Sequence, residues 1–210
     1  MSENPDDILN SSVRNFLAAT ASKSPTPGGG SVAALAGAMA ASLGEMSLQY
    51  TLGKKQFESH REEITQAIDK LRKAAGLMQD LVGEDMAAYA LLSAALKIPA
   101  DKRDTDPSYL PAVVAAIRAP LSIGGLALHI LQLCRDFLNK CNPYLVSDLG
   151  VAAALARATV HAAELNVLVN ARLLPNLHEA EDTRKKAADL SLKADMLWHD
   201  VRQHMHEHLK

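Results

Sequence analysis

A polar stripe runs along residues 147–173, a segment otherwise built largely of Val, Ala and Leu. Asp148 and Asn166 are eighteen residues apart, which is five whole turns of an α-helix. Thr159 and Asn170 fall within about 20° and about 40° of the same line. A solvated face usually carries Lys, Glu and Arg, so the stripe indicates either a polar site or helix caps and satisfied backbone ends.

Two adjacent acids, Glu84 and Asp85, have apolar residues on both sides. A buried carboxyl group has a raised pKa, which suits a residue that accepts and returns a proton near neutral pH. The same pattern also fits two acids on a solvated helix face. The pair is therefore either part of an acid–base site or a surface feature.

Three consecutive glycines, Gly28 to Gly30, precede a segment rich in Ala and Gly. Glycine loses more backbone freedom on folding than any other residue, so three glycines in a row need a structural reason. The reason is a tight turn, a close helix crossing or a ligand that binds the bare N–H groups. Gly30, Gly37 and Gly44 recur every seven residues and form one small-residue stripe, which favours close approach of another helix. We expect one subunit to lack the helices that would cover this stripe and the polar stripe together, which predicts a homodimer.

Histidines supply weak candidates for metal binding. His204 and His208 have the i, i+4 spacing of a metal-binding pair, but a solvated helix end is the better interpretation. His161 and Glu164 reverse the Glu-x-x-His order of di-iron bundles, and the chain has no second copy. We therefore predict no metal site.

The composition favours one globular domain, residues 1–210, with 48% apolar and 22% charged residues. The formal net charge of −2 indicates no excess of basic residues of the kind that binds nucleic acid. Cys134 and Cys141 are expected to be free thiols. The longest apolar run, residues 31–44, looks too short and too rich in Gly and Ala to span a membrane, and no signal-peptide pattern precedes it. These features predict a soluble, cytoplasmic protein without a membrane or nucleic-acid partner.

Apolar spacing predicts an all-α fold, a single-domain bundle of about six main helices. Asn4 is expected to cap the first of them. Their expected spans are about 5–21, 31–52, 58–96, 111–139, 147–173, and 177 to the C-terminus. The third helix is long, and Pro120 is expected to kink or split the fourth.

Five segments together resemble the cyclodeaminase/cyclohydrolase family of folate enzymes. They are PTPGGGS (25–31), TLGKKQF (51–57), EDMAAY (84–89), SDLGVAA (147–153) and LNVLVNA (165–171). The family contains the C-terminal half of formiminotransferase-cyclodeaminase and stand-alone methenyltetrahydrofolate cyclohydrolases, and the resemblance covers nearly the whole chain. The chain departs from the family pattern in the loop 99–110 and at Glu164, where relatives usually have a small or apolar residue.

The resemblance implies an all-helical subunit, a homodimer or higher homo-oligomer, and a folate cleft lined by these motifs. It assigns the proton-carrying role to Asp148, with Asp85 as the second carboxylate and no metal or further cofactor. Lys54 and Lys55 would meet the glutamate tail of folate or, equally, complement a helix dipole. The residues expected to bind the rest of the substrate are Pro27, Gly28, Gly29, Gly30, Ser31, Asn166 and Asn170.

The resemblance leaves the reaction open. Methenyltetrahydrofolate cyclohydrolase is preferred because the sequence contains no formiminotransferase domain, and formiminotetrahydrofolate cyclodeaminase comes second. Both reactions pass through a tetrahedral carbon between N5 and N10 of the folate, and both need one group that accepts and donates a proton. The alternative of another class is a non-catalytic helical bundle that binds folate or a partner helix.

Overall fold

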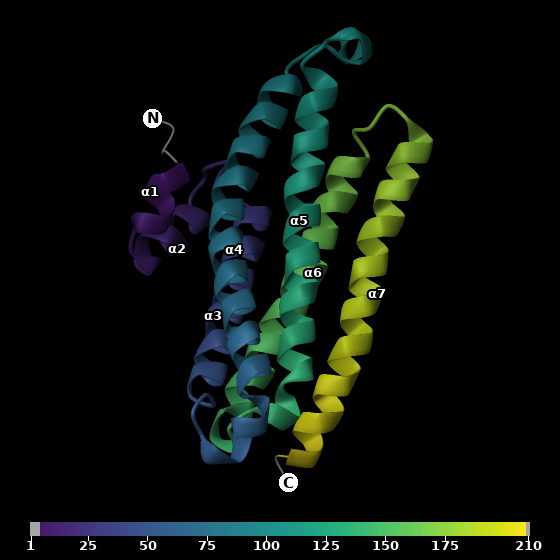
Figure 1. The fold of residues 1–210 in the computed structure, drawn as a ribbon. Helices are drawn as coiled ribbons and strands as arrows, with labels where there is room; N and C mark the ends of the chain where they lie inside the picture. Colours follow the sequence, from purple (N-terminus) through teal and green to yellow (C-terminus); the bar gives the residue numbers. More distant parts are fainter. Residues whose placement is uncertain (1–4, 209–210) are drawn as a thin grey trace.

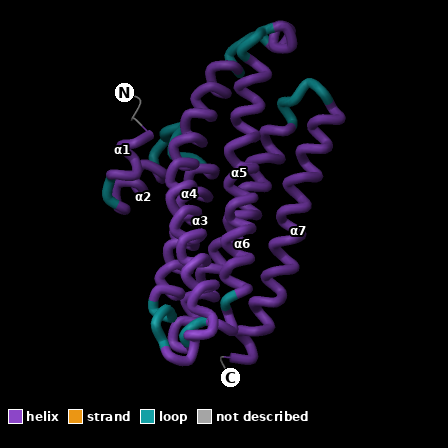
Figure 2. Tube along the Cα trace, viewed as in Figure 1, coloured by secondary structure: helices purple, strands orange, loops and turns teal. Residues whose placement is uncertain are grey.

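The computed structural model describes residues 5–208, so the predicted cap Asn4 lies outside the described residues. The described chain forms a bundle of helices, and no strand occurs in it (Figures 1 and 2). Its α-helices are α1 (Pro5–Asn10), α2 (Val13–Ala21), α3 (Gly29–Gln49), α4 (Arg61–Ala95), α5 (Tyr109–Asp136), α6 (Val146–Ala171) and α7 (Leu177–His208). Short 3₁₀ turns occupy Lys55–His60, Ala100–Thr105, Leu138–Lys140 and Pro143–Leu145. The predicted all-α class and the long helix at α4 are confirmed.

The helix predicted over residues 5–21 is in fact two helices. Ser11 donates its hydroxyl to the carbonyl of Ile8 at 2.8 Å, and Ser12 accepts from the backbone N–H of Asn15 at 3.2 Å. Serine side chains compete in this way for backbone groups that would otherwise continue the helix. Ser12 therefore starts α2 as its N-cap.

Pro120 does not split the fourth predicted helix. Helix α5 runs without a break from Tyr109 to Asp136 and contains Pro120 in its interior. The carbonyl of Ala116, which the residue at position 120 would normally bond, instead accepts the side-chain amide of Asn170 at 2.7 Å. A neighbouring helix thus satisfies the backbone group that the proline leaves without a helical donor.

The glycine stripe of α3 lies inside the bundle. A Cβ on Gly37 would be 2.7 Å from Met78 Cε, and one on Gly44 would be 3.4 Å from Cys134 Sγ. The predicted close helix crossing is therefore confirmed. Helices of the same chain cover this stripe, so it gives no support to the homodimer that was expected from the two stripes together.

Three segments are long and apolar enough to cross a membrane by length and composition: Gly29–Gln49, Tyr109–Asp136 and Pro143–Ala171. The expectation that the run at 31–44 is too short fails by this criterion, because its helix extends to Gln49. About half of each apolar window is buried inside the bundle. These segments pack against one another (Figure 1), so much of their apolar surface forms the core of the fold.

Candidate active site

A cavity of about 420 Å³ opens where the N-terminus of α3 meets α4, α5 and α6. Its polar side is formed by Thr26, Gly28, Gly29, Gly30, Asp85, Tyr89, Asn166 and Asn170. Apolar side chains, among them Leu92, Leu96 and Leu173, line the rest. A largely apolar cavity with a few convergent polar groups is the usual form of a small-molecule site.

Asp85 lies directly over the glycine-rich start of α3. The Ser31 hydroxyl donates to Asp85 Oδ2 at 2.8 Å, and the backbone N–H of Ser31 donates to the same carboxylate. A Cβ on Gly30 would be only 1.9 Å from Asp85 Oδ1, so Gly30 is required for this close approach. Burial raises the pKa of Asp85, and the two bonds from Ser31 partly oppose that rise.

The Ser31 hydroxyl should tune the proton affinity of Asp85. Ser31→Ala removes a donor that stabilises the charged carboxylate, so the pKa of Asp85, already raised by burial, should rise further. The measurement is an NMR titration of the Asp85 carboxyl carbon. Ser42→Ala changes an exposed serine of the same helix and should leave the titration as in the wild type. An unchanged Asp85 titration in Ser31→Ala would contradict this account.

The two asparagines present their carbonyl oxygens as acceptors. Asn166 Nδ2 donates to the backbone carbonyl of Ala162 at 2.9 Å, and Asn170 Nδ2 donates to that of Ala116 at 2.7 Å. A backbone carbonyl only accepts, so the amide nitrogen must be the atom that faces it. Both Oδ1 atoms therefore remain as acceptors for a ligand. Together with Asp85 they form an acceptor wall, defined as Asp85, Asn166 and Asn170. The two asparagine oxygens suit a ring edge bearing N–H donors, and the carboxylate suits proton transfer.

The structure brings together most of the predicted site. Gly28, Gly29 and Gly30 line the same cavity as the acceptor wall, and Ser31 bonds to its carboxylate. Pro27 is buried in the loop and does not line the cavity. The sequence interpretation missed Tyr89, one helical turn beyond Asp85, although the EDMAAY segment contains it. Its partly exposed ring offers a flat face on which a planar ligand can stack.

Asp148 and the two lysines lie outside this cavity. Asp148 is in the first turn of α6, roughly 27 Å along the helix axis from Asn166. Lys54 and Lys55 border a separate hollow with Asn142. The prediction of one site that joins all of these residues therefore fails within a single subunit. Equal angular position on a helix does not make two residues neighbours along its axis.

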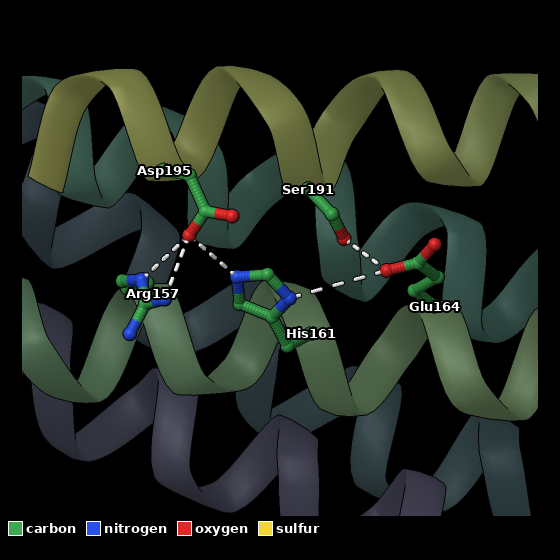
Figure 3. A network of polar contacts seen from close by, with 5 residues as sticks. All are labelled: Arg157, His161, Glu164, Ser191 and Asp195. Atoms are coloured by element: carbon green, nitrogen blue, oxygen red, sulfur yellow. Dashed lines mark hydrogen bonds and ion pairs between the residues drawn. The ribbon is translucent and has the colours of Figure 1, made fainter.

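His161 and Glu164 connect α6 to α7 (Figure 3). Neither residue lines the cavity. His161 Nε2 lies 3.0 Å from Asp195 Oδ1, and Arg157 pairs with the same oxygen at 2.7 Å. The bonds from Arg157 and His161 lower the pKa of Asp195. Glu164, the departure from the family pattern, accepts a hydrogen bond from Ser191 of α7. Glu164 therefore connects α6 to α7, and among the described residues no group of three or more His, Cys, Asp or Glu side chains is placed to hold a metal ion.

The remaining sequence candidates also lie away from the cavity. His204 and His208 stack on each other with ring centroids 5.9 Å apart, and His204 is half-buried rather than part of a solvated tail. Cys134 and Cys141 are buried free thiols, as predicted. Burial raises the pKa of Cys134 to about 12, so this thiol is unreactive.

The fold and cavity define an all-α protein with a small-molecule site whose central group is a half-buried carboxylate. Residues 12–189 match the formiminotransferase-cyclodeaminase family, and the chain belongs to that family. This confirms the resemblance seen in the sequence motifs.

Two curated relatives illustrate the range of the family. Methenyltetrahydrofolate cyclohydrolase of Methylorubrum extorquens is 29% identical over 90% of this chain and 92% of its own length. Rat formimidoyltransferase-cyclodeaminase is 29% identical over 89% of this chain, which spans about a third (35%) of the rat protein. The crystal structure of formiminotetrahydrofolate cyclodeaminase from Thermotoga maritima covers 97% of this chain with a TM-score of 0.89 and 23% identity, which establishes the shared fold.

Proposed function

We propose that the chain is a methenyltetrahydrofolate cyclohydrolase, which converts 5,10-methenyl-tetrahydrofolate and water to 10-formyl-tetrahydrofolate. The observation that carries the proposal is the position of Asp85, half-buried against Gly30 in the cavity that also holds Asn166 and Asn170. The cyclohydrolase of M. extorquens supports this reaction, since it is matched over 92% of its length. Membership of a family whose relatives are named as enzymes argues against the non-catalytic alternative.

In this reaction Asp85 first accepts a proton and then donates it to a different atom. Its ionised carboxylate accepts a proton from water as the water oxygen bonds to the methenyl carbon, which leaves a neutral tetrahedral carbon between N5 and N10. Asp85 then donates that proton to N5 as the carbon–N5 bond breaks. The hydroxyl proton passes to solvent as the formyl carbonyl forms on N10, so one proton is released overall. The cationic methenyl carbon is already electrophilic, and the proposed reaction therefore uses no metal or further cofactor.

The second candidate is formiminotetrahydrofolate cyclodeaminase. It is favoured by the match of 89% of the chain to rat formimidoyltransferase-cyclodeaminase. In that reaction N10 attacks the formimino carbon, and Asp85 carries the N10 proton to the departing amine, which leaves as ammonia. The same carboxylate serves both reactions because both form a tetrahedral carbon between N5 and N10.

One pair of assays separates the candidates. Purified protein is mixed with 5,10-methenyl-tetrahydrofolate, and loss of its near-ultraviolet absorbance is compared with the rate without protein. A parallel reaction contains 5-formimino-tetrahydrofolate and is followed by ammonia release. We expect accelerated loss of the methenyl compound. Ammonia release without that acceleration would identify a cyclodeaminase, and no turnover of either compound would refute the enzymatic proposal.

We also propose a homodimer, on grounds that differ from the glycine stripe. The neighbouring helices α3 and α6 each expose a row of apolar side chains, including Met39 on α3 and Val151, Leu165 and Val169 on α6. An apolar surface of this kind on a folded chain is typical of an interface. Val169 also lines the cavity, so this interface would border the folate site.

Light scattering on dilute protein tests the dimer. The expected mass is twice the 22.5 kDa of one chain. Met39→Lys places a charge on the exposed row, where Met39 is 52% exposed, and should shift the protein toward the monomer without unfolding it. A wild-type monomer with full turnover would refute both the dimer and a site shared across it.

A further inference from the structure

Pro120 occupies a position where proline is unfavourable. It lies in the interior of α5, eleven residues after the helix begins at Tyr109. Proline has no backbone N–H, and its ring clashes with the carbonyl four residues earlier. In α5 that carbonyl belongs to Ala116, which lines the folate-site cavity. The proline therefore leaves one backbone acceptor without its helical donor at the wall of the site.

The donor that replaces the missing N–H is Asn170 on α6. Its Nδ2 lies 2.7 Å from the Ala116 carbonyl oxygen, a contact between residues 54 positions apart in the chain. Asn166, one turn earlier, has a different arrangement, because its amide bonds to Ala162 of its own helix at 2.9 Å. Asn170 thus depends on a carbonyl from another helix, and that carbonyl has no competing N–H donor four residues later because residue 120 is proline.

We propose that Pro120 is a positioning residue of the folate site: it turns the Ala116 carbonyl toward Asn170 and so fixes the Asn170 carboxamide with its oxygen toward the ligand. The ligand group that hydrogen-bonds to this oxygen is a ring edge with N–H donors, such as the 2-amino-4-oxo edge of a pterin. This identification of the ligand rests on the proposed function. The orientation of Asn170 rests on the contact with Ala116 alone.

Pro120→Ala restores the N–H and lets the Ala116 carbonyl return to its own helix. The variant should fold at least as well as the wild type, since alanine is the best helix former. We expect KM for methenyl-tetrahydrofolate to rise about 5- to 10-fold, the scale of one lost hydrogen bond, with kcat changed less than about twofold. Asn170→Ala should raise KM similarly, and the double variant should add little to either change. Pro111→Ala is the control, because Pro111 is in the first turn of the same helix and exposed.

A second measurement needs no ligand. In ¹⁵N NMR of the ligand-free protein, hydrogen exchange of the Asn170 side-chain amide should be slow in the wild type and in Pro111→Ala, and faster in Pro120→Ala. Unchanged exchange in Pro120→Ala would overturn the proposal, as would an unchanged KM. If the amide responds as expected while the wild type turns over no folate, the positioning of Asn170 stands and the proposed function fails. The two ideas are therefore tested separately.

Discussion

Replacing Asp85 by asparagine is expected to lower kcat for methenyl-tetrahydrofolate by about 10²- to 10⁴-fold, the usual contribution of a general acid–base group. Asparagine has nearly the same size and accepts the hydrogen bond from Ser31, but it cannot carry the proton from water to N5. The measurement is single-turnover and steady-state hydrolysis, with circular dichroism to establish that the helices remain. Wild-type turnover in this variant would remove Asp85 from the mechanism.

The same substitution should not destabilise the protein at neutral pH. Because burial raises the pKa of Asp85 in the folded state, its contribution to stability is greatest below the unfolded-state pKa and falls as pH rises through the folded-state pKa. Asp85→Asn removes this pH dependence. At pH values above the folded-state pKa of Asp85, the melting temperature of the variant should therefore equal or exceed that of the wild type. Glu84→Gln is the matched control, because Glu84 is the exposed neighbour on the same helix, and it should keep normal turnover.

Asp148→Asn tests the other carboxylate suggested by the sequence. Asp148 lies far from the cavity of its own subunit, so its loss should affect turnover much less than the loss of Asp85. A loss as large as that of Asp85→Asn, in a folded variant, would mean that a partner subunit brings its Asp148 to the site.

The sequence predicts the helices well because apolar spacing of 3.6 residues depends on local contacts. It fails where a single side chain competes with the backbone. Ser11 and Ser12 break the first helix through their hydroxyls, and nothing in the apolar stripe of that segment reveals the break. Pro120 leaves α5 continuous because Asn170, a distant residue in the sequence, bonds to the carbonyl it leaves open. Such compensation becomes visible only in three dimensions.

The site shows the same limit. The glycine-rich loop, Asp85 and the two asparagines could be recognised from motif segments, and the structure places them around one cavity. Helical periodicity also aligned Asp148 with Asn166, but periodicity reports the angle around a helix and not the distance along it. Which end of α6 meets the glycine loop depends on how the helices pack, and no local pattern contains that information.

Alanine substitutions in the glycine loop, Gly28 to Gly30, each add one methyl group, and the variants differ in what that methyl group contacts. A Cβ on Gly30 would lie 1.9 Å from Asp85 Oδ1, whereas the nearest atoms to a Cβ on Gly29 and Gly28 are 3.4 Å and 3.8 Å away. Gly30→Ala must therefore displace the carboxylate from Ser31. We expect turnover to fall at least about 100-fold, as for other displaced acid–base groups, and the protein to lose about 1–3 kcal/mol of stability from overpacking.

Gly29→Ala and Gly28→Ala should be progressively milder, because their added methyl groups make ordinary contacts. Gly76→Ala in the exposed middle of α4 is the control: its Cβ would meet no atom within 4 Å, so alanine should stabilise the helix by about 0.5–1 kcal/mol and leave turnover unchanged. Thermal melting and steady-state hydrolysis on the four variants measure both quantities. If Gly30→Ala matched Gly76→Ala in both, Asp85 would not lie over this glycine in solution, and the chemistry assigned to it would have to move to another residue.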